Sequence, residues 1–366
     1  MPDDARPRLR DRLIWSGMAP AGLARLLTGR LRRIAPDRLA QALLLAPTAA
    51  GVGMLNAVQR LIHGRAIART ALTAPPVVII GHHRSGTTHL HKLLSLLPDL
   101  HAPTSYECFA PGHFLVTGGV LPRLLRPLIA ATRPMDAMPN DLSQPQEDDF
   151  ALLSMGAPTP YRALAFPERA WHPPPEGDLT GPVVMDAQEA FLKALTLRHG
   201  KRIVLKSPFH TARLRALGAR YPGAVFVHMV RDLDQVGPST LNFWRQLESG
   251  QRLGPPAPAD DGRSGFALGV FDWMYERFFA DLAQVPPPSL ITIHYDDLIA
   301  DPRAALRRIA ALLGPGGGAL DLSRVDRHLD QVATYRPNSF APQTDIYAGS
   351  AIAAAYRARY LDRPTP

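Results

Sequence analysis

Cysteine and lysine are scarce in this 366-residue chain, and each scarcity carries information. Cys108 is the single cysteine, which excludes an intramolecular disulfide and a cysteine-based zinc site and favours a reducing, cytoplasmic location. Arginine outnumbers lysine by 37 to 4, so the position of each lysine is worth attention. The acidic start is not followed by a compact apolar run with a small-residue cleavage site, so a cleaved secretory signal is not expected.

Charge is spread unevenly along the chain. Residues 1–74 contain twelve arginines and four aspartates, which accounts for +8 of the +9 net charge of the whole protein. The remainder is close to neutral, so no nucleic-acid partner is expected, because such a surface would be basic throughout. The overall content of 46% apolar and 20% charged residues is ordinary for a folded, soluble protein.

Charged residues are absent between Leu39 and Gln59, a stretch of 21 residues that is long enough to cross a bilayer. Polar residues, glycines and Pro47 dilute its apolar character, so a spanning helix is not predicted. We favour a buried helical hairpin within a basic, helical extension that covers residues 1–74. The alternative interpretation is a peripheral membrane contact made by this stretch and its flanking arginines.

Beyond residue 74, short β-branched runs alternate with helical patterns. Strands are expected at 77–80, 203–205, 225–230 and 290–293, and helices at 88–97, 211–220 and 303–313. This alternation predicts an α/β fold with three layers, in which helices cover both faces of a central parallel sheet. We place this core at residues 75–315 and expect residues 316–366 to pack on it as a C-terminal tail.

The segment Gly81–Thr88 forms a strand–loop–helix unit with the flanking elements, and its glycines have P-loop spacing. Thr87 occupies the place of the lysine with which ATP and GTP hydrolases hold the β- and γ-phosphates. The cation is Arg84, inside the loop. Backbone N–H groups and a helix N-terminus favour an anion here, so we expect a phosphate or sulfate site that differs from that of the hydrolases.

Three motifs resemble those of sulfotransferases that use 3′-phosphoadenosine 5′-phosphosulfate (PAPS). The first is the loop run Arg84-Ser85-Gly86-Thr87-Thr88, the second is Arg231 with Ser239 eight residues later, and the third is Tyr295-Asp296-Asp297-Leu298 before Asp301-Pro302. The motifs occur in order between about residues 77 and 313, and the likeness is to the bacterial branch of the family.

The resemblance implies a sulfotransferase that moves a sulfuryl group from PAPS to a hydroxyl and releases 3′,5′-adenosine bisphosphate (PAP). In the family the loop holds the 5′-phosphosulfate, here Arg84, Ser85, Gly86, Thr87 and Thr88, and the second motif holds the 3′-phosphate, here Arg231 and Ser239. Lys206 resembles the active-site lysine that contacts the leaving group. Separated anions need two cationic sites at the carboxyl ends of neighbouring strands, which agrees with this assignment.

The base that accepts the proton of the acceptor hydroxyl is less defined by the sequence. Cytosolic family members carry a histidine two residues after the active-site lysine, but this position is Pro208. Other branches use a glutamate just after the first helix, and Glu107 matches that placement. We favour Glu107 over Glu147, whose acidic cluster at 147–149 is also typical of a solvated helix start, and His210 is the third candidate.

Histidines are concentrated at positions 82, 83, 89 and 91, but no metal site is predicted from them. His89 and His91 are two residues apart on a helix and face different directions, and no cysteine or well-spaced carboxylate completes a zinc set. No metal is needed to bind the transferring group if side-chain cations do so.

Two other functions stay open at this point. A P-loop phosphotransferase is disfavoured by Thr87, and a non-enzymatic membrane- or nucleic-acid-binding protein would depend on residues 1–74. For the sulfotransferase, the apolar N-terminal region suggests an amphiphilic acceptor, a lipid or glycolipid, among small-molecule, lipid and glycan hydroxyls.

Overall fold

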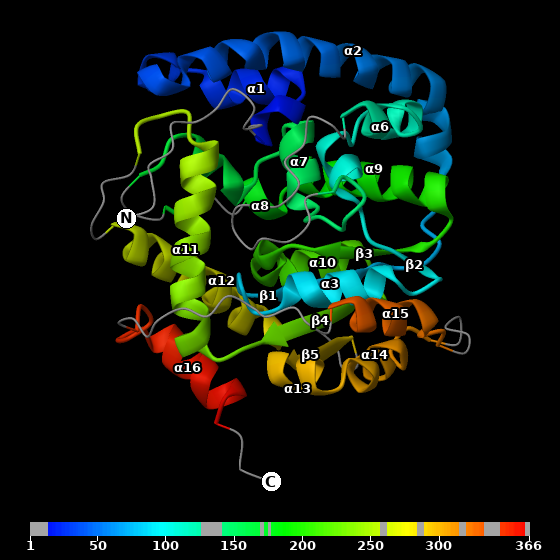
Figure 1. Cartoon of the computed structure of the whole chain (residues 1–366), viewed down its shortest axis with the longest axis vertical. Helices are drawn as coiled ribbons and strands as arrows, with labels where there is room; N and C mark the ends of the chain where they lie inside the picture. Colours follow the sequence, from blue (N-terminus) through cyan, green and yellow to red (C-terminus); the bar gives the residue numbers. More distant parts are fainter. Residues whose placement is uncertain are drawn as a thin grey trace.

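The computed structural model describes residues 14–125, 141–168, 172–174, 177–256, 262–283, 289–314, 320–332 and 345–362. Its centre is a five-stranded parallel sheet with the strand order β2-β3-β1-β4-β5 (Figure 1). The strands are β1 (Val77–Gly81), β2 (Leu100–His101), β3 (Arg202–Lys206), β4 (Val225–Val230) and β5 (Leu290–His294). All four strands expected from β-branched runs are confirmed. The two-residue β2 is too short to produce a recognisable pattern.

Successive residues of the strands point to opposite faces of the sheet and enter two hydrophobic clusters. Val77 and Ile79 of β1 belong to the smaller cluster, and Val78 and Ile80 belong to the larger one. The smaller cluster includes residues of α3 (Thr87–Ser95), α13 (Tyr295–Ala300), α14 (Pro302–Ala310) and α15 (Ser323–Val332). The larger includes residues of α7 (Asp149–Met155), α9 (Pro182–His199), α10 (Leu214–Arg220), α11 (Leu233–Gln251), α12 (Gly262–Leu282) and α16 (Ala351–Tyr360). The three-layer α/β fold is therefore confirmed.

The N-terminal region packs on the larger cluster through Trp15, Leu26 and Leu45, which are buried. It consists of the 3-10 turns η1 (Ile14–Gly17), η2 (Leu31–Arg33) and η3 (Pro36–Arg38) and the helices α1 (Pro20–Leu27) and α2 (Leu39–Arg69). In Figure 1 the helix α2 runs along the top of the molecule, above α1 and α9.

The expected helical hairpin is wrong, because α2 is one continuous helix of 31 residues with Pro47 inside it. Proline removes the N–H that would bond to the carbonyl of Leu43. Leu43 lies on the exposed side of α2, where water can solvate that carbonyl. The Thr48 hydroxyl donates to the carbonyls of Leu44 and Leu45, both at 2.9 Å, so the turn around the proline stays hydrogen-bonded.

Short helical segments connect the longer elements. They are α4 (Ser105–Phe109), α5 (Phe114–Thr117), α6 (Leu121–Leu125), α8 (Gly177–Thr180) and the 3-10 helices η5 (Pro160–Ala165) and η6 (Pro208–Arg213). Gln59 of α2 accepts a hydrogen bond from the backbone N–H of Leu115 at 2.8 Å, which fastens α2 over α5.

The packing of α1 against the end of α7 can be tested by substitution of a glycine at the contact. A Cβ on Gly22 would lie 2.6 Å from the Cα of Gly156, whereas a Cβ on Gly51 of α2 would meet nothing within 4 Å. We expect Gly22→Ala to destabilise the protein by about 1–3 kcal/mol, and Gly51→Ala to stabilise it by about 0.5–1 kcal/mol. Urea unfolding of both variants measures the difference, and equal effects would contradict the described packing of α1.

Candidate active site

The loop after β1 has a backbone that only a few residue types can adopt. Gly81 and Gly86 have φ angles of +136° and +96°, and Arg84 has a φ angle of +67°. A Cβ on Gly81 would lie 2.5 Å from the carbonyl oxygen of Met229, and one on Gly86 would lie 2.5 Å from the ring of Tyr295. Among the residues that the structure describes, Arg84 is the one non-glycine with a positive φ. Such strain costs about 1–3 kcal/mol and is typical of a functional loop.

The two motifs that the sequence predicts to bind anions meet at the carboxyl edge of the sheet. Arg84 Nε donates to Ser239 Oγ at 2.8 Å, although the two residues are 155 positions apart. Arg231, directly after β4, donates through Nη1 to the carbonyl oxygen of Arg84 at 3.3 Å. Its guanidinium lies 3.9 Å from the ring centroid of Tyr295, the first residue of the third motif. All three motifs therefore contribute to one location.

No described carboxylate forms an ion pair with Arg231. Its acidic neighbours have other roles, because Asp232 accepts the N–H of Asp234 at the start of α11 and Asp234 pairs with Arg357 of α16 at 3.0 Å. Nε of Arg231 is buried and has no hydrogen-bond partner among the described residues. A buried, unpaired donor on a cation is what an anionic ligand would satisfy.

The side chains of the other loop residues are buried or half-buried. The Ser85 hydroxyl is buried and donates to the carbonyl oxygen of His82 at 2.7 Å, which closes the loop on itself. Thr87 is buried at the start of α3, and Thr88 is half-buried next to it. His83 is also buried, and burial lowers its pKa well below the ordinary value.

Lys206, at the end of β3, lies against Glu147 and not against Glu107. Its Nζ donates to Glu147 Oε1 at 2.5 Å, and the Tyr161 hydroxyl donates to Glu147 Oε2 at 2.5 Å. Burial, followed by the charge of Glu147, raises the pKa of Tyr161 well above its ordinary value, so the phenol keeps its proton. The acidic cluster is therefore buried in the site rather than solvated.

Asp148 contacts both Lys206 and His210. Its carboxylate accepts the backbone N–H of Lys206 at 3.0 Å and lies 2.8 Å from Nε2 of His210. Burial by itself raises the pKa of Asp148, but the charges of His210 and Arg213 and the hydrogen bond with His210 outweigh it and lower the pKa to about 2. His210 is fully buried, which leaves it no surface toward a substrate.

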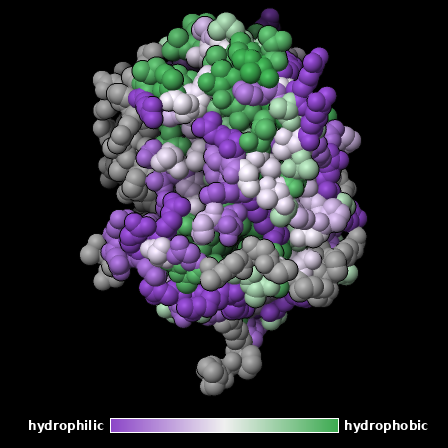
Figure 2. Space-filling model, turned by 90° about the vertical axis from the view of Figure 1, so that its right-hand side faces the viewer, coloured by the Kyte–Doolittle hydropathy of each residue, from purple (hydrophilic) through white to green (hydrophobic). Residues whose placement is uncertain are grey.

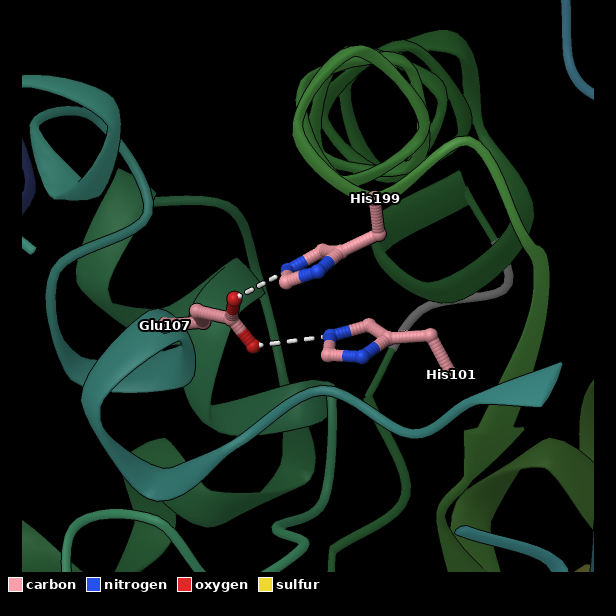
Figure 3. Close-up of side chains that lie close together, drawn as sticks. All are labelled: His101, Glu107 and His199. Carbon is pink, nitrogen blue, oxygen red and sulfur yellow. Dashed lines mark hydrogen bonds and ion pairs between the residues drawn. The ribbon is translucent and has the colours of Figure 1, made fainter. Parts of the chain in front are cut away.

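Glu107 lies in a different group of side chains. Its carboxylate lies 3.0 Å from Nε2 of His101 and 2.7 Å from Nε2 of His199, and it also accepts the backbone N–H of Thr104 at 2.8 Å (Figure 3). Burial raises its pKa, but the hydrogen bonds from the two histidines outweigh this, and the pKa of Glu107 stays well below its usual range.

Tyr161 is a residue of the candidate site that the sequence did not single out, whereas Asp148 was included only as a member of an acidic cluster. Asp148 belongs to the acidic cluster at 147–149, which provides a local signal. Tyr161 lies in an ordinary proline-containing segment, and its role depends on contacts with Glu147 that form only in the folded chain.

The family model described as "Sulfotransferase family" matches residues 75–315. The chain is 35% identical over 294 residues to the omega-hydroxy-beta-dihydromenaquinone-9 sulfotransferase Stf3 of Mycobacterium bovis and of Mycobacterium tuberculosis, which covers 77% of this chain and 74% of each relative. The chain therefore belongs to the sulfotransferase family.

Solved structures agree with this fold. The sulfotransferase STF9 from Mycobacterium avium superposes with a TM-score of 0.66 at 20% identity, over 96% of this chain and 91% of that one. The sulfotransferase STF1 from Mycobacterium tuberculosis superposes with a TM-score of 0.58 at 17% identity, over 93% and 90% of the two chains.

The lowered pKa of Asp148 predicts a pH dependence of stability. Its folded-state pKa lies below the ordinary 3.8, so its contribution is present above about pH 4 and is lost as the pH falls toward about 2. We expect wild type to lose roughly 2 kcal/mol more than Asp148→Asn over this interval. Urea unfolding at a series of pH values measures it, and parallel curves for the two proteins would contradict the assignment.

Proposed function

We propose that this sulfotransferase moves the sulfuryl group of PAPS to the hydroxyl of an amphiphilic lipid. The observation that supports the donor most directly is the meeting of Arg84, Ser239 and Arg231 at one edge of the sheet, beside the pair of Lys206 and Glu147. Two separate cationic positions suit a nucleotide with separated anions better than they suit a single phosphate chain.

The residues present fit such a donor. The glycines let the loop pack directly against Met229 and Tyr295, where a Cβ would collide, and the unpaired Nε of Arg231 is ready to donate to an anion. The loop from Arg84 to Thr88 would hold the 5′-phosphosulfate, and Arg231 with Ser239 would hold the 3′-phosphate. When bound, PAPS supplies a sulfuryl group whose S–O bond to phosphate breaks as a bond to the acceptor oxygen forms.

Glu147 is the base in this proposal. It accepts the proton of the acceptor hydroxyl, while the ammonium of Lys206 stabilises negative charge on the leaving phosphate oxygen. Tyr161 and Lys206 hold one carboxylate oxygen each, which fixes the direction of the carboxylate. His210 acts through Asp148 as a positioning residue for Lys206.

Glu107, the first choice from the sequence, is less suited to this role. Its carboxylate contacts two imidazoles and not Lys206, and its lowered pKa makes it a weak proton acceptor. The contact with Lys206 favours Glu147, and kinetics of the two glutamine variants decide between them.

An apolar surface over α2 supports a lipid acceptor. Figure 2 shows apolar side chains gathered at the top of the molecule, where α2 lies. The exposed large apolar residues of α2 are Leu39, Leu43, Leu44, Met54, Val58, Leu61 and Ile62, and Val116, Val120 and Leu124 follow in the segment from α5 to α6. Monomeric soluble proteins rarely expose such a continuous surface without a binding role.

The segment Pro36–Arg69 is also long and apolar enough to cross a membrane, and 22% of its most apolar window is buried. Contacts with α1, α5 and α9 hold α2 along the surface of the domain, which favours lying in a membrane interface over crossing the bilayer. Arg60 and Arg65 are exposed on the same helix and would face anionic lipid headgroups. The relative Stf3 is named for a hydroxylated menaquinone, which is likewise an apolar acceptor.

Replacement of Glu147, the proposed base, by glutamine tests the proposed sulfuryl transfer. We expect Glu147→Gln to lower kcat by about 10²–10⁴-fold with little change in the KM for PAPS, because the carboxylate acts on the acceptor proton. Transfer of a labelled sulfuryl group from PAPS to a hydroxylated isoprenoid quinone measures it. Glu107→Gln removes the same charge and should cost much less. Loss of activity in Glu107→Gln alone would assign the base to Glu107, and Mg²⁺-dependent transfer from ATP would favour a phosphotransferase.

Vesicle flotation tests the lipid-facing surface. We expect the protein to float with vesicles that contain anionic phosphatidylglycerol, and Leu61→Asp combined with Ile62→Asp to reduce the floating fraction several-fold. Ile299→Asp is the matched control, since Ile299 is 50% exposed on α13, at the opposite end of the molecule in Figure 1. A wild-type protein that stays with the unbound fraction would contradict the proposal.

A further inference from the structure

His101, Glu107 and His199 form a cluster that the reaction does not use. One ligand atom from each residue lies within 4.8 Å of the other two. The residues come from three elements: the end of β2, the first turn of α4 and the last turn of α9, which lies 92 positions beyond Glu107 in the chain. In Figure 3 both imidazoles point the same nitrogen, Nε2, toward the one carboxylate.

We propose that these three residues bind a divalent transition-metal ion, Zn²⁺ in particular, with a water molecule as the fourth ligand. Two imidazole nitrogens and one carboxylate oxygen are a ligand set that zinc accepts in three-ligand protein sites. Metal–ligand bonds of about 2.0–2.2 Å place tetrahedral ligands roughly 3.3 Å apart. Nε2 of His101 lies 3.0 Å from Oε2 and Nε2 of His199 lies 2.7 Å from Oε1, so each imidazole contacts its own carboxylate oxygen, and an ion would draw both nitrogens toward one of them.

The two imidazole rings of the cluster lie against each other. The imidazoles of His101 and His199 are stacked, with centroids 3.6 Å apart and ring planes 19° apart. Tetrahedral coordination by both Nε2 atoms would spread the rings further apart, so binding of an ion must open this stack. Face-to-face stacking is less favourable than offset or edge-to-face contact, so little is lost when the rings separate.

Glu107 is held in place before any ion binds. Thr104 donates to Glu107 Oε2 through its backbone N–H at 2.8 Å and through its hydroxyl at 3.0 Å. Such hydrogen bonds orient a carboxylate ligand and raise the affinity of metal sites. The side chains of His101 and His199 keep 15% and 24% of their surface exposed, which leaves a path for the ion from solvent.

A bound ion would fasten the segment that leads to Glu147. The backbone N–H of Gln146 donates to the carbonyl oxygen of Pro103 at 2.8 Å. Pro103 directly precedes Thr104, and Gln146 directly precedes Glu147, so this bond joins the two segments. The site would hold β2, α4 and α9 together without touching the donor, so it is independent of the proposed sulfuryl transfer.

Metal binding by the untagged protein, stripped with a chelator, tests the proposal. We expect one Zn²⁺ per chain, and His101→Ala and His199→Ala to weaken its binding at least about 100-fold, since even the loss of a supporting residue costs 10–100-fold. Co²⁺ should show visible ligand-field absorption in the wild type and not in the variants. His172→Ala is the matched control, because its imidazole lies 3.8 Å from Glu168 on the exposed surface.

Thermal unfolding separates metal loss from misfolding. Zn²⁺ should raise the Tm of the wild type and of His172→Ala but leave the Tm of His199→Ala unchanged, with equal metal-free Tm values showing that the variants fold. Absence of stoichiometric Zn²⁺ binding, or unchanged affinity in both histidine variants, would overturn the proposal and leave the cluster as a hydrogen-bonded contact.

Discussion

Parallel pairing of β1 with β4 is the constraint on which the site depends. The register that sets Gly81 opposite Met229 ends both strands at the same edge of the sheet. The loop with Arg84 and the arginine after β4 therefore emerge side by side. Tyr356 of α16 donates to the carbonyl oxygen of Arg231 and accepts its N–H, both at 3.1 Å, so the C-terminal region also fixes this arginine.

Below this edge, three consecutive carboxylates pair with Lys206 at the end of β3 and with His210 and Arg213 of η6. Glu147 pairs with Lys206, Asp148 with His210, and Asp149 with Arg213. All six side chains are buried. Removal of one partner from such a pair leaves an uncompensated buried charge, which costs about 3–5 kcal/mol. The start of α7 is thus held against β3 and η6, and Lys206 is held against Glu147.

Most of the fold and the anion loop could be predicted, because their signals are local in sequence. The β-branched run before Gly81 and the glycines of the loop specify a strand and a turn within a dozen residues. The carboxylate beside Lys206 could not be chosen, because the placement of Glu107 resembles that of the base in other family branches, whereas Glu147 lies in an acidic cluster that is also typical of a solvated helix start. What distinguishes them is a contact between residues 59 positions apart. Likewise, His101 and His199 give no signal until folding brings them to Glu107.

The length of α2 was missed for a different reason. Pro47 and the neighbouring glycines are residues that commonly end a helix, and a sequence pattern does not show which carbonyls water can reach. Packing of one side of α2 on η1, α1 and α9 stabilises the helix across the proline. The other side is left apolar and exposed.

Calorimetric titration with PAP tests the central claim that two distant motifs form one nucleotide site. The account predicts micromolar binding that weakens about 10–100-fold in both Arg84→Ala and Arg231→Ala. Arg303→Ala, at a surface ion pair with Asp326, should bind as the wild type does. Binding that persists in either site variant, or a preference for ATP with Mg²⁺, would contradict the account.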